Sequence, residues 1–570
     1  ENFGEDPYLT SRLGAGYVRG LQSQKVSATL KHYIAHGTPE GGINLSPVHM
    51  GEREVREIAV EPFETCSKEA GALSVMPAYS ELDGIPVHAS KFLLTDLLRD
   101  EIGFDGYTIS DFGATGMMNF MHKVAKDGVE AGHLSLNAGL DMEAPVRFAY
   151  CDEFLDEIKN SPEFIEKIDC AVRRILSVKF RLGLFDNPYS QPDAISEIHS
   201  KSSLELSRKI AHETMVLLKN EDSILPLSKN KKVLLVGPGA DIAQTGDYSP
   251  NNAPEYTVTI KKALEEKLGE NLTFIKGSYI AETIDGEIEK AIRKANDNDV
   301  IVAVVGDNSC FFGGIGWGKE NGDTAITSGE GFDMSKIELP DAQKTLIREL
   351  YKTGKPIVLL LTSGRPYAIT EEVEYSKGII ATWYPGELGG YAVYDILFGD
   401  VSPSGKLPIS FPRSTGHIPC YYNYKTSARG YYHKPGTVEN PGRDYVFDSP
   451  DALFPFGFGL SYTTFKYSNL KAEKSDGNTV NVSFKVKNTG DVIAKESSLL
   501  FVSQEFCPTT PFVKRLRKFT KEEYLPNEEK TIVFTLDEND FSYIDINMKK
   551  AIGKGLFKIS VADMVCEVEL

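Results

Sequence analysis

The sequence has little that points to a membrane, a disulfide framework or a polyanionic partner. It contains no run of 18 or more apolar residues, so no membrane-spanning helix is predicted. Its seven cysteines show no CxxC spacing, which argues against a zinc site and is typical of buried free thiols. Acidic residues outnumber basic ones by 81 to 62, for a formal net charge of -19. This charge argues against a nucleic-acid or anionic-membrane partner and weakly favours an uncharged substrate.

At 570 residues the chain is too long for one hydrophobic core, and its patterns change along its length. In the first third, short apolar strands alternate with helical segments, which is typical of βα units and a parallel sheet. A second α/β region has longer apolar runs, which indicate a sheet covered on both faces. From about residue 465 the polarity alternates with period two, which predicts a small β-sandwich. The predicted boundaries are 1–190, 191–415, an aromatic connecting segment at 416–464, and 465–570.

The first region contains four strand candidates and ends in an amphipathic helix at 168–185. These strands begin near Val26, Gly71, Gly106 and Gly139, and a helix is expected between the first two.

The second region is predicted to begin with a helix over 203–221. The sequence "GPGAD" after its first strand weakly suggests a dinucleotide fingerprint, but a plain strand-to-helix turn is favoured because the third glycine is missing. The predicted strands are 231–239, 299–307, 355–364 and 378–386.

Polar side chains stand at the ends of three strand candidates in the first region. They are Lys31 with His32, then Tyr79, then Asp111. A carboxylate such as Asp111, taken alone, would more often cap a helix. In a parallel barrel, however, residues at the carboxyl ends of successive strands converge on one place. The sequence therefore predicts a polar site there, with "GATG" after Phe112 leaving space beside the carboxylate.

A polar cavity with one carboxylate suits glycoside chemistry, which needs two. The best second candidate is Glu330, which lies between Gly329 and Gly331 in a loop of the second α/β region. Flanking glycines let a backbone approach a ligand closely and leave the carboxyl group unhindered. The rival carboxylates are Asp333, Glu320, Asp141 and Glu143.

Short motifs follow one another along the chain in a characteristic order. They include "ENFGEDPYL", "KHY", "VMPAYSELDGIP", "GFDGYTISDFGA", "AGLDMEAP", "SGEGFD", "ATWYPGELGG", "SGKLPISFP" and "FPFGFGLSYTTF". This order resembles that of family 3 glycoside hydrolases of the β-glucosidase/β-xylosidase type over essentially the whole chain. The resemblance implies a partial (β/α) TIM-type barrel, an α/β sandwich with a mostly parallel sheet, and a C-terminal fibronectin-III-like β-sandwich.

By this resemblance Asp111 is the nucleophile and Glu330 the general acid/base, donated from the other domain. Lys31, His32 and Tyr79 would bind the terminal sugar. The implied reaction is a two-step displacement with retention at the anomeric carbon, and it needs no metal or cofactor.

Three features differ from the usual family pattern. The segment after Lys31 and His32 shows no arginine where many relatives place a sugar-binding one. Phe112 follows the nucleophile where a tryptophan is common, and it is expected to line the sugar site. Met334 stands where an Asp-Arg pair is usual, which removes a charge near Glu330. The expected function is an exo-acting β-glycosidase that releases terminal β-D-glucosyl or β-D-xylosyl residues from an oligosaccharide or aryl β-glycoside. The alternative is a non-catalytic carbohydrate-binding or structural chain.

Eight strands close a (β/α) barrel, and only four candidates precede the second region. Because a βα unit takes roughly 30 residues, about 120 or more barrel residues are expected upstream of "ENFGEDPYL". An open half-barrel would expose apolar surface. We therefore expect a missing N-terminal segment or a second copy of the chain to cover that face.

Overall fold

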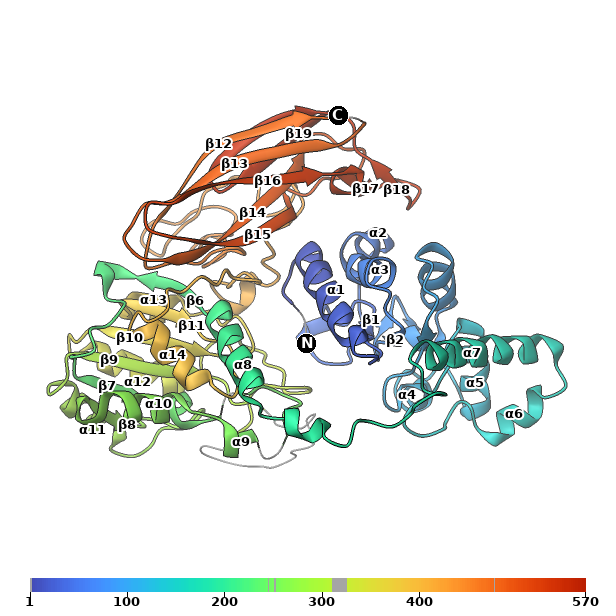
Figure 1. Cartoon of the computed structure of the whole chain (residues 1–570), viewed down its shortest axis with the longest axis horizontal. Coiled ribbons are helices and arrows are strands. Elements are labelled where there is room, and N and C mark those ends of the chain that lie inside the picture. The colour runs from blue at the N-terminus through green and yellow to red at the C-terminus, as the bar shows by residue number, and fades with distance from the viewer. Residues whose placement is uncertain (1–2, 244, 251–252, 310–324, 476) are drawn as a thin grey trace. The chain divides into compact units, whose positions relative to one another are not determined.

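The computed structural model describes residues 3–243, 245–250, 253–309, 325–475 and 477–570 (Figure 1). Contacts divide the chain into two compact units. One contains Glu1–Ala194 with Tyr543–Ala551, and the other contains Ile195–Ser542 with Ile552–Leu570. The four domain boundaries predicted above stay predictions. In the described part of the chain, no helix has the length and apolar character needed to cross a membrane.

The first unit is built on a three-stranded parallel sheet. Its strands are β1 (Thr29–Tyr33), β2 (Ser74–Pro77) and β5 (Tyr107–Thr108), in the order β1-β2-β5. They correspond to the first three strand candidates. The sheet does not close into a barrel within the described residues, so the expected partial barrel is confirmed.

The fourth strand candidate is wrong as a strand. It forms one isolated parallel bridge, Ile109 to Met142, next to β5. The backbone N–H of Thr108 donates to the side chain of Asp141 at 2.9 Å, so this N–H takes no part in a ladder with the candidate strand. On the other side, the backbone N–H of Ala144 donates to the Ser110 hydroxyl at 2.9 Å instead of a strand carbonyl, so the pairing ends there.

Helices cover the sheet and bury its apolar residues. Ile34, Val75, Leu94 and Leu98 share one core cluster, and the predicted helix at 168–185 overlaps α7. The helical elements are α1 (Pro7–Ser23), α2 (Glu52–Glu54), a π-helical turn (Val55–Ala59), α3 (Val60–Lys68), a short 3-10 turn (Val87–Ala89), a π-helix (Phe92–Glu101), α4 (Ala114–Phe120), α5 (Gly128–Ala138), α6 (Asp152–Ile158) and α7 (Pro162–Arg181).

One face of α7 leaves Val172, Leu176 and Phe180 exposed, at 46%, 39% and 67%.

The second unit contains a six-stranded sheet in the order β6-β11-β10-β9-β7-β8. Only β6 runs antiparallel to its neighbour, so the predicted mostly parallel sheet is confirmed. Its strands are β6 (Val216–Asn220), β7 (Val233–Val236), β8 (Leu272–Ile275), β9 (Val300–Gly306), β10 (Ile357–Thr362) and β11 (Gly378–Ala381).

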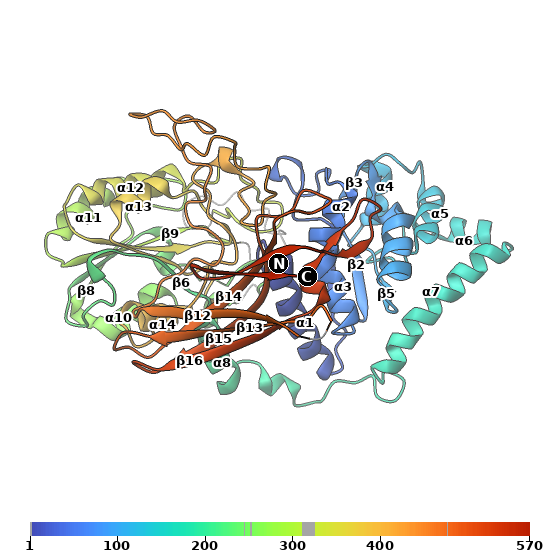
Figure 2. The ribbon, with the colours of Figure 1, turned by 90° about the horizontal axis from the view of Figure 1, so that it is seen from above.

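Helices lie on both faces of this sheet, as the continuous apolar runs predict (Figures 1 and 2). One face is covered by α8 (Lys201–Thr214), α10 (Ile260–Leu268) and α14 (Gly389–Leu397). The other is covered by α11 (Glu287–Ala295), α12 (Asp341–Tyr351) and α13 (Thr370–Tyr375).

Two strands of this sheet are absent from the prediction. The expected helix at 203–221 ends at Thr214, and β6 follows because its first residues are fully buried against β11. β8 is short and only partly buried, so it carries a weak hydrophobic signal. The "GPGAD" segment forms a short 3-10 turn, and a Cβ on Gly237 would lie 2.2 Å from the Val304 carbonyl oxygen. Close packing against β9 therefore accounts for that glycine.

Two antiparallel sheets form the C-terminal β-sandwich, and they pack β12-β13-β16 against β15-β14-β19-β20. In β13, Val480, Val482, Phe484 and Val486 are buried and alternate with more exposed residues, as the sequence predicts. The strands are β12 (Phe465–Lys474), β13 (Val480–Asn488), β14 (Ala494–Gln504), β15 (Arg515–Tyr524), β16 (Glu529–Leu536), β19 (Leu556–Val561) and β20 (Met564–Glu569).

The aromatic segment before the sandwich is packed rather than free. Tyr422 stacks on Phe456 at 4.4 Å and meets Phe501 edge-on at 5.5 Å. Its hydroxyl accepts the backbone N–H of Leu516 at 2.7 Å, which ties the segment to β15.

Candidate active site

Asp111 lies just beyond β5, at the carboxyl end of the three-stranded sheet. It is only 6% exposed. One carboxylate oxygen, Oδ1, accepts the backbone N–H of Phe112 at 2.7 Å. The other, Oδ2, is buried and accepts no hydrogen bond from any described residue, although His32 Nε2 lies 3.3 Å away. A buried carboxylate oxygen without a hydrogen bond is rare in proteins, so this atom calls for a functional explanation.

His32 and Lys31 reach this place because β1 is anchored just after them. Tyr33 is fully buried, and its hydroxyl donates to the Leu93 carbonyl at 3.0 Å. The pairing of β1 with β2 shifts register before Tyr33, and the Lys31–His32 and Tyr33–Ile34 peptide bonds are cis. The ring of His36 lies 4.7 Å from that of His32, so a second imidazole borders the site.

Tyr79 and Phe112 complete the group from the ends of β2 and β5. The Tyr79 hydroxyl donates to the Phe112 carbonyl at 3.0 Å, which links the two strand ends. The Phe112 side chain is 62% exposed, so its ring is available for contact with a ligand. The structure thus brings together the predicted site residues of this unit.

The surroundings act on the charge of Asp111 in opposite directions. Burial raises the pKa of Asp111 above its ordinary value, because the ionised form loses water. The Phe112 N–H, the Tyr79 hydroxyl and the positive charge of Lys31 act to lower the same pKa. A nucleophile must be ionised, so these donors and this cation favour the form that reacts.

Gly113 allows the chain to turn immediately after the carboxylate. Its φ is +74°, a left-handed conformation that glycine adopts at little cost, and it caps α4. A Cβ there would meet nothing within 4 Å. The glycine is therefore explained by the turn rather than by the clearance of space that the sequence suggested.

Two rival carboxylates have structural roles. Asp141 forms ion pairs with Arg99 at 2.6 Å and Arg174 at 2.7 Å, and its side chain is 1% exposed. Glu143 accepts the backbone N–H groups of Phe148 and Tyr150, each at 2.9 Å. Because their oxygens are engaged in holding the fold, these two residues do not compete for the catalytic role.

Glu330 belongs to the second unit, in the loop between β9 and α12. Gly329 and Gly331 have φ values of +128° and +78°, so the backbone on both sides takes conformations that favour glycine. The N–H of Phe332 donates to the Gly329 carbonyl at 3.1 Å and closes a tight turn with Glu330 at its tip.

Asp247 and Tyr248 hold Glu330 from a neighbouring loop. The Glu330 N–H donates to Asp247 Oδ2 at 2.8 Å, and the Tyr248 hydroxyl donates to Glu330 Oε2. One side chain fixes the backbone and the other fixes the carboxylate. Nothing in the sequence around "TGDYSP" signals this role, because Asp and Tyr are common in loops.

A buried ion pair supports the same loop. Arg365 follows β10 and donates to the carbonyls of Thr327 and Phe332 at 3.1 and 3.0 Å. Its Nε lies 3.7 Å from Asp307, whose side chain is fully buried. Met334 Sδ accepts the Tyr367 hydroxyl at 3.3 Å, so the uncharged residue at 334 packs inward while Arg365 supplies the charge.

The remaining rivals near Glu330 are distinguished by position. Asp333 is exposed, whereas Glu330 is half-buried. Glu320 lies outside the described residues. The pairing of Glu330 with Asp111 stays a prediction.

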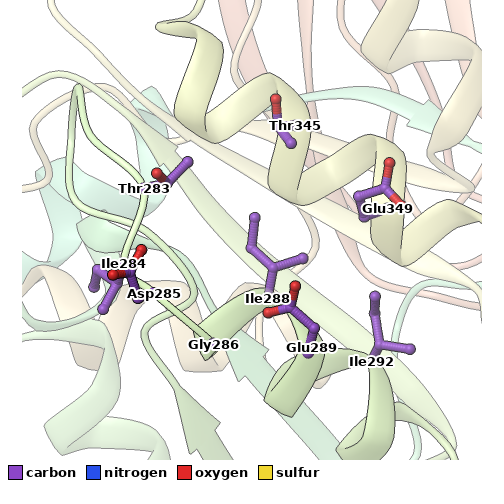
Figure 3. A pocket seen from close by; sticks show the side chains of 9 residues that line it. All are labelled: Thr283, Ile284, Asp285, Gly286, Ile288, Glu289, Ile292, Thr345 and Glu349. Atoms are coloured by element: carbon purple, nitrogen blue, oxygen red, sulfur yellow. The ribbon is translucent and has the colours of Figure 1, made fainter.

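A separate cleft of about 350 Å³ lies between α11 and α12 (Figure 3). Its lining includes Asp285, Glu289 and Glu349 but no aromatic ring and no basic donor. The lining contains neither Asp111 nor Glu330, so this cleft is not the candidate site.

Comparison with known families agrees with the fold. The chain matches the glycosyl hydrolase family 3 N terminal domain over residues 1–178 and the glycosyl hydrolase family 3 C-terminal domain over 215–462. It also matches the fibronectin type III-like domain over 496–564. The chain belongs to glycosyl hydrolase family 3. It is a glycoside hydrolase.

Individual relatives match along nearly the whole chain. A β-xylosidase of Formosa agariphila is 35% identical over 98% of this chain and 78% of its own length. A periplasmic β-glucosidase of Salmonella typhimurium is 33% identical over 98% of this chain and 76% of its own. The crystal structure of a β-glucosidase from Listeria innocua in complex with glucose has a TM-score of 0.89 at 32% identity, covering 100% of this chain and 78% of that one.

Proposed function

We propose that the protein is an exo-acting, retaining β-glycosidase that removes terminal β-D-glucosyl or β-D-xylosyl residues. The observation that carries the proposal is the Asp111 carboxylate, which presents a buried Oδ2 without a hydrogen bond beside His32. The relatives named above are a β-xylosidase and β-glucosidases, and a mutant of the Listeria innocua enzyme has been solved with laminaribiose.

In the proposed mechanism Asp111 attacks the anomeric carbon while Glu330 protonates the leaving oxygen. A covalent glycosyl-enzyme results, and Glu330 then deprotonates the water that releases the sugar. Retention requires the two carboxyl groups to approach to about 5–5.5 Å when the site is occupied. Lys31, His32 and the Tyr79 phenol would hold the sugar hydroxyls, with the Phe112 ring beside them.

The direct test compares p-nitrophenyl β-D-glucoside with p-nitrophenyl β-D-xyloside on the same preparation. We expect hydrolysis of at least one of them, with the β-anomer of the sugar as the first product by NMR. The ratio of the two kcat/KM values identifies the preferred sugar. An α-anomer as first product would contradict retention, and no turnover of any β-glycoside would favour the non-catalytic alternative.

Tyr248→Phe should lower kcat/KM by an amount that depends on the leaving group of the substrate. Without the phenol donor the Glu330 carboxylate loses one of its fixed contacts. We expect kcat/KM to fall about tenfold for a disaccharide and to change little for a dinitrophenyl glycoside, whose leaving group needs little protonation.

The matched control is Tyr256→Phe. Tyr256 is 46% exposed, belongs to the same stretch of chain and stacks on His199 at 4.3 Å. It should leave both substrates unaffected. Equal losses on both substrates in Tyr248→Phe would show that Tyr248 does not act through Glu330.

A further inference from the structure

A buried histidine touches the backbone of the residue proposed as nucleophile. His88 lies in the 3-10 turn Val87–Ala89 and is 1% exposed. Its Nε2 accepts the backbone N–H of Asp111 at 3.2 Å. A second hydrogen bond joins its ring to the backbone of Ala78, at the end of β2.

His88 completes a chain of contacts across the three strand ends. The β2 and β5 strands pair through Ser74–Tyr107 and Val75–Thr108. This pairing ends before Asp111, so the ladder does not hold the backbone of that residue. Ala78 donates its N–H to the Tyr33 carbonyl at 2.5 Å, next to His32. The imidazole then spans from Ala78 to Asp111.

This geometry determines the state of the ring. Nε2 can accept the Asp111 N–H only if it carries no proton, so the proton must be on Nδ1, the nitrogen free to donate to the Ala78 carbonyl. Burial lowers the pKa of His88 to about 3, and the neighbouring His122 acts in the same direction. The ring is therefore neutral over the pH range in which glycosidases work.

We infer that His88 is a positioning residue for the nucleophile, and this inference rests on the proposed role of Asp111. The neutral imidazole fixes the Asp111 backbone relative to the ends of β1 and β2. It thereby aims Oδ2 toward the sugar held by the residues at those ends. The reaction, rather than ground-state binding, should depend on this contact.

Two substitutions separate the contacts of the ring. In His88→Gln the side-chain amide reaches the level of Nε2 and can still accept the Asp111 N–H. In His88→Asn the amide reaches only the level of Nδ1. It can still donate to the Ala78 carbonyl, but it leaves the Asp111 N–H unpaired. We expect His88→Asn to lower kcat about tenfold to a hundredfold, with KM changed less than about threefold. His88→Gln should recover most of that rate.

His417 provides a matched control in the other unit. It is buried, its Nδ1 accepts the Arg413 N–H at 3.3 Å, and its Nε2 donates to the Pro450 carbonyl at 2.7 Å. His417→Gln leaves one partly buried backbone N–H without its histidine acceptor, much as His88→Asn does for a buried one. Both should lower Tm by similar amounts, but only His88→Asn should lower kcat per folded molecule.

Equal kcat losses in His88→Asn and His88→Gln, or a normal kcat in His88→Asn, would overturn the inference. If neither variant folds, neutron diffraction of the unmodified protein decides, because a deuteron on Nε2 of His88 excludes the contact and one on Nδ1 supports it. Asp111→Ala is measured in parallel. If that variant keeps its turnover, the nucleophile assignment has failed, whereas an inactive Asp111→Ala beside a normal His88→Asn defeats only the inference about His88.

Discussion

Asp111→Ala is expected to reduce kcat by about three orders of magnitude or more on every β-glycoside, since no covalent intermediate can form without the nucleophile. The fold should survive. The carboxylate is buried and its Oδ2 accepts no hydrogen bond, so its removal relieves a desolvation cost while sacrificing the contacts to the Phe112 N–H and to His32. We expect Tm to stay within about 2–4 °C of the original.

Added azide should restore part of the activity of this variant with an aryl glycoside and yield a glycosyl azide of inverted configuration, because the small anion fits the space of the lost carboxylate. Near-normal turnover in Asp111→Ala without azide would refute the assignment.

Asp141→Ala is the matched contrast, because Asp141 is also a buried carboxylate at the end of this sheet. Its removal leaves the guanidinium groups of Arg99 and Arg174 without the carboxylate that pairs with them. A loss of about 3–5 kcal/mol in unfolding free energy is expected. Asp111→Ala should lose activity and keep its stability, whereas Asp141→Ala should lose stability. This contrast separates a catalytic role from a structural one.

Glu330→Ala should have the second largest effect, and the effect should depend on the leaving group. For a disaccharide, whose leaving oxygen must be protonated, we expect kcat/KM to fall about a hundredfold to ten-thousandfold. A dinitrophenyl glycoside leaves readily without a proton, so its glycosylation step should be far less affected. Steady-state and single-turnover rates on both substrates measure the difference.

Asp333→Ala controls for the loss of a carboxylate in the same loop. Asp333 is exposed three positions away, and its removal should leave both substrates within about twofold of the original rate. If Asp333→Ala, rather than Glu330→Ala, shows the dependence on leaving group, the acid has been assigned to the wrong residue of the loop.

Several elements could be predicted because their signals are local. Alternation at Val480, Val482 and Phe484 identifies a sandwich strand, since its two faces differ in burial. The continuous apolar run of β9 likewise identifies a strand buried on both faces. By contrast, the sequence pattern assigns β6 to the end of a helix, because its apolar run directly continues the amphipathic pattern of α8.

By itself, the sequence determined the family, the fold class and the placement of Lys31, His32, Tyr79 and Asp111 at strand ends, because parallel strands bring their carboxyl ends to one edge. Only the tertiary structure decided how those residues are held. The contact of His88 with the Asp111 backbone spans 23 positions, and that of Tyr248 with Glu330 spans 82. Such contacts leave no periodic trace in a sequence, since they depend on where separate turns meet rather than on the spacing of residues within one element.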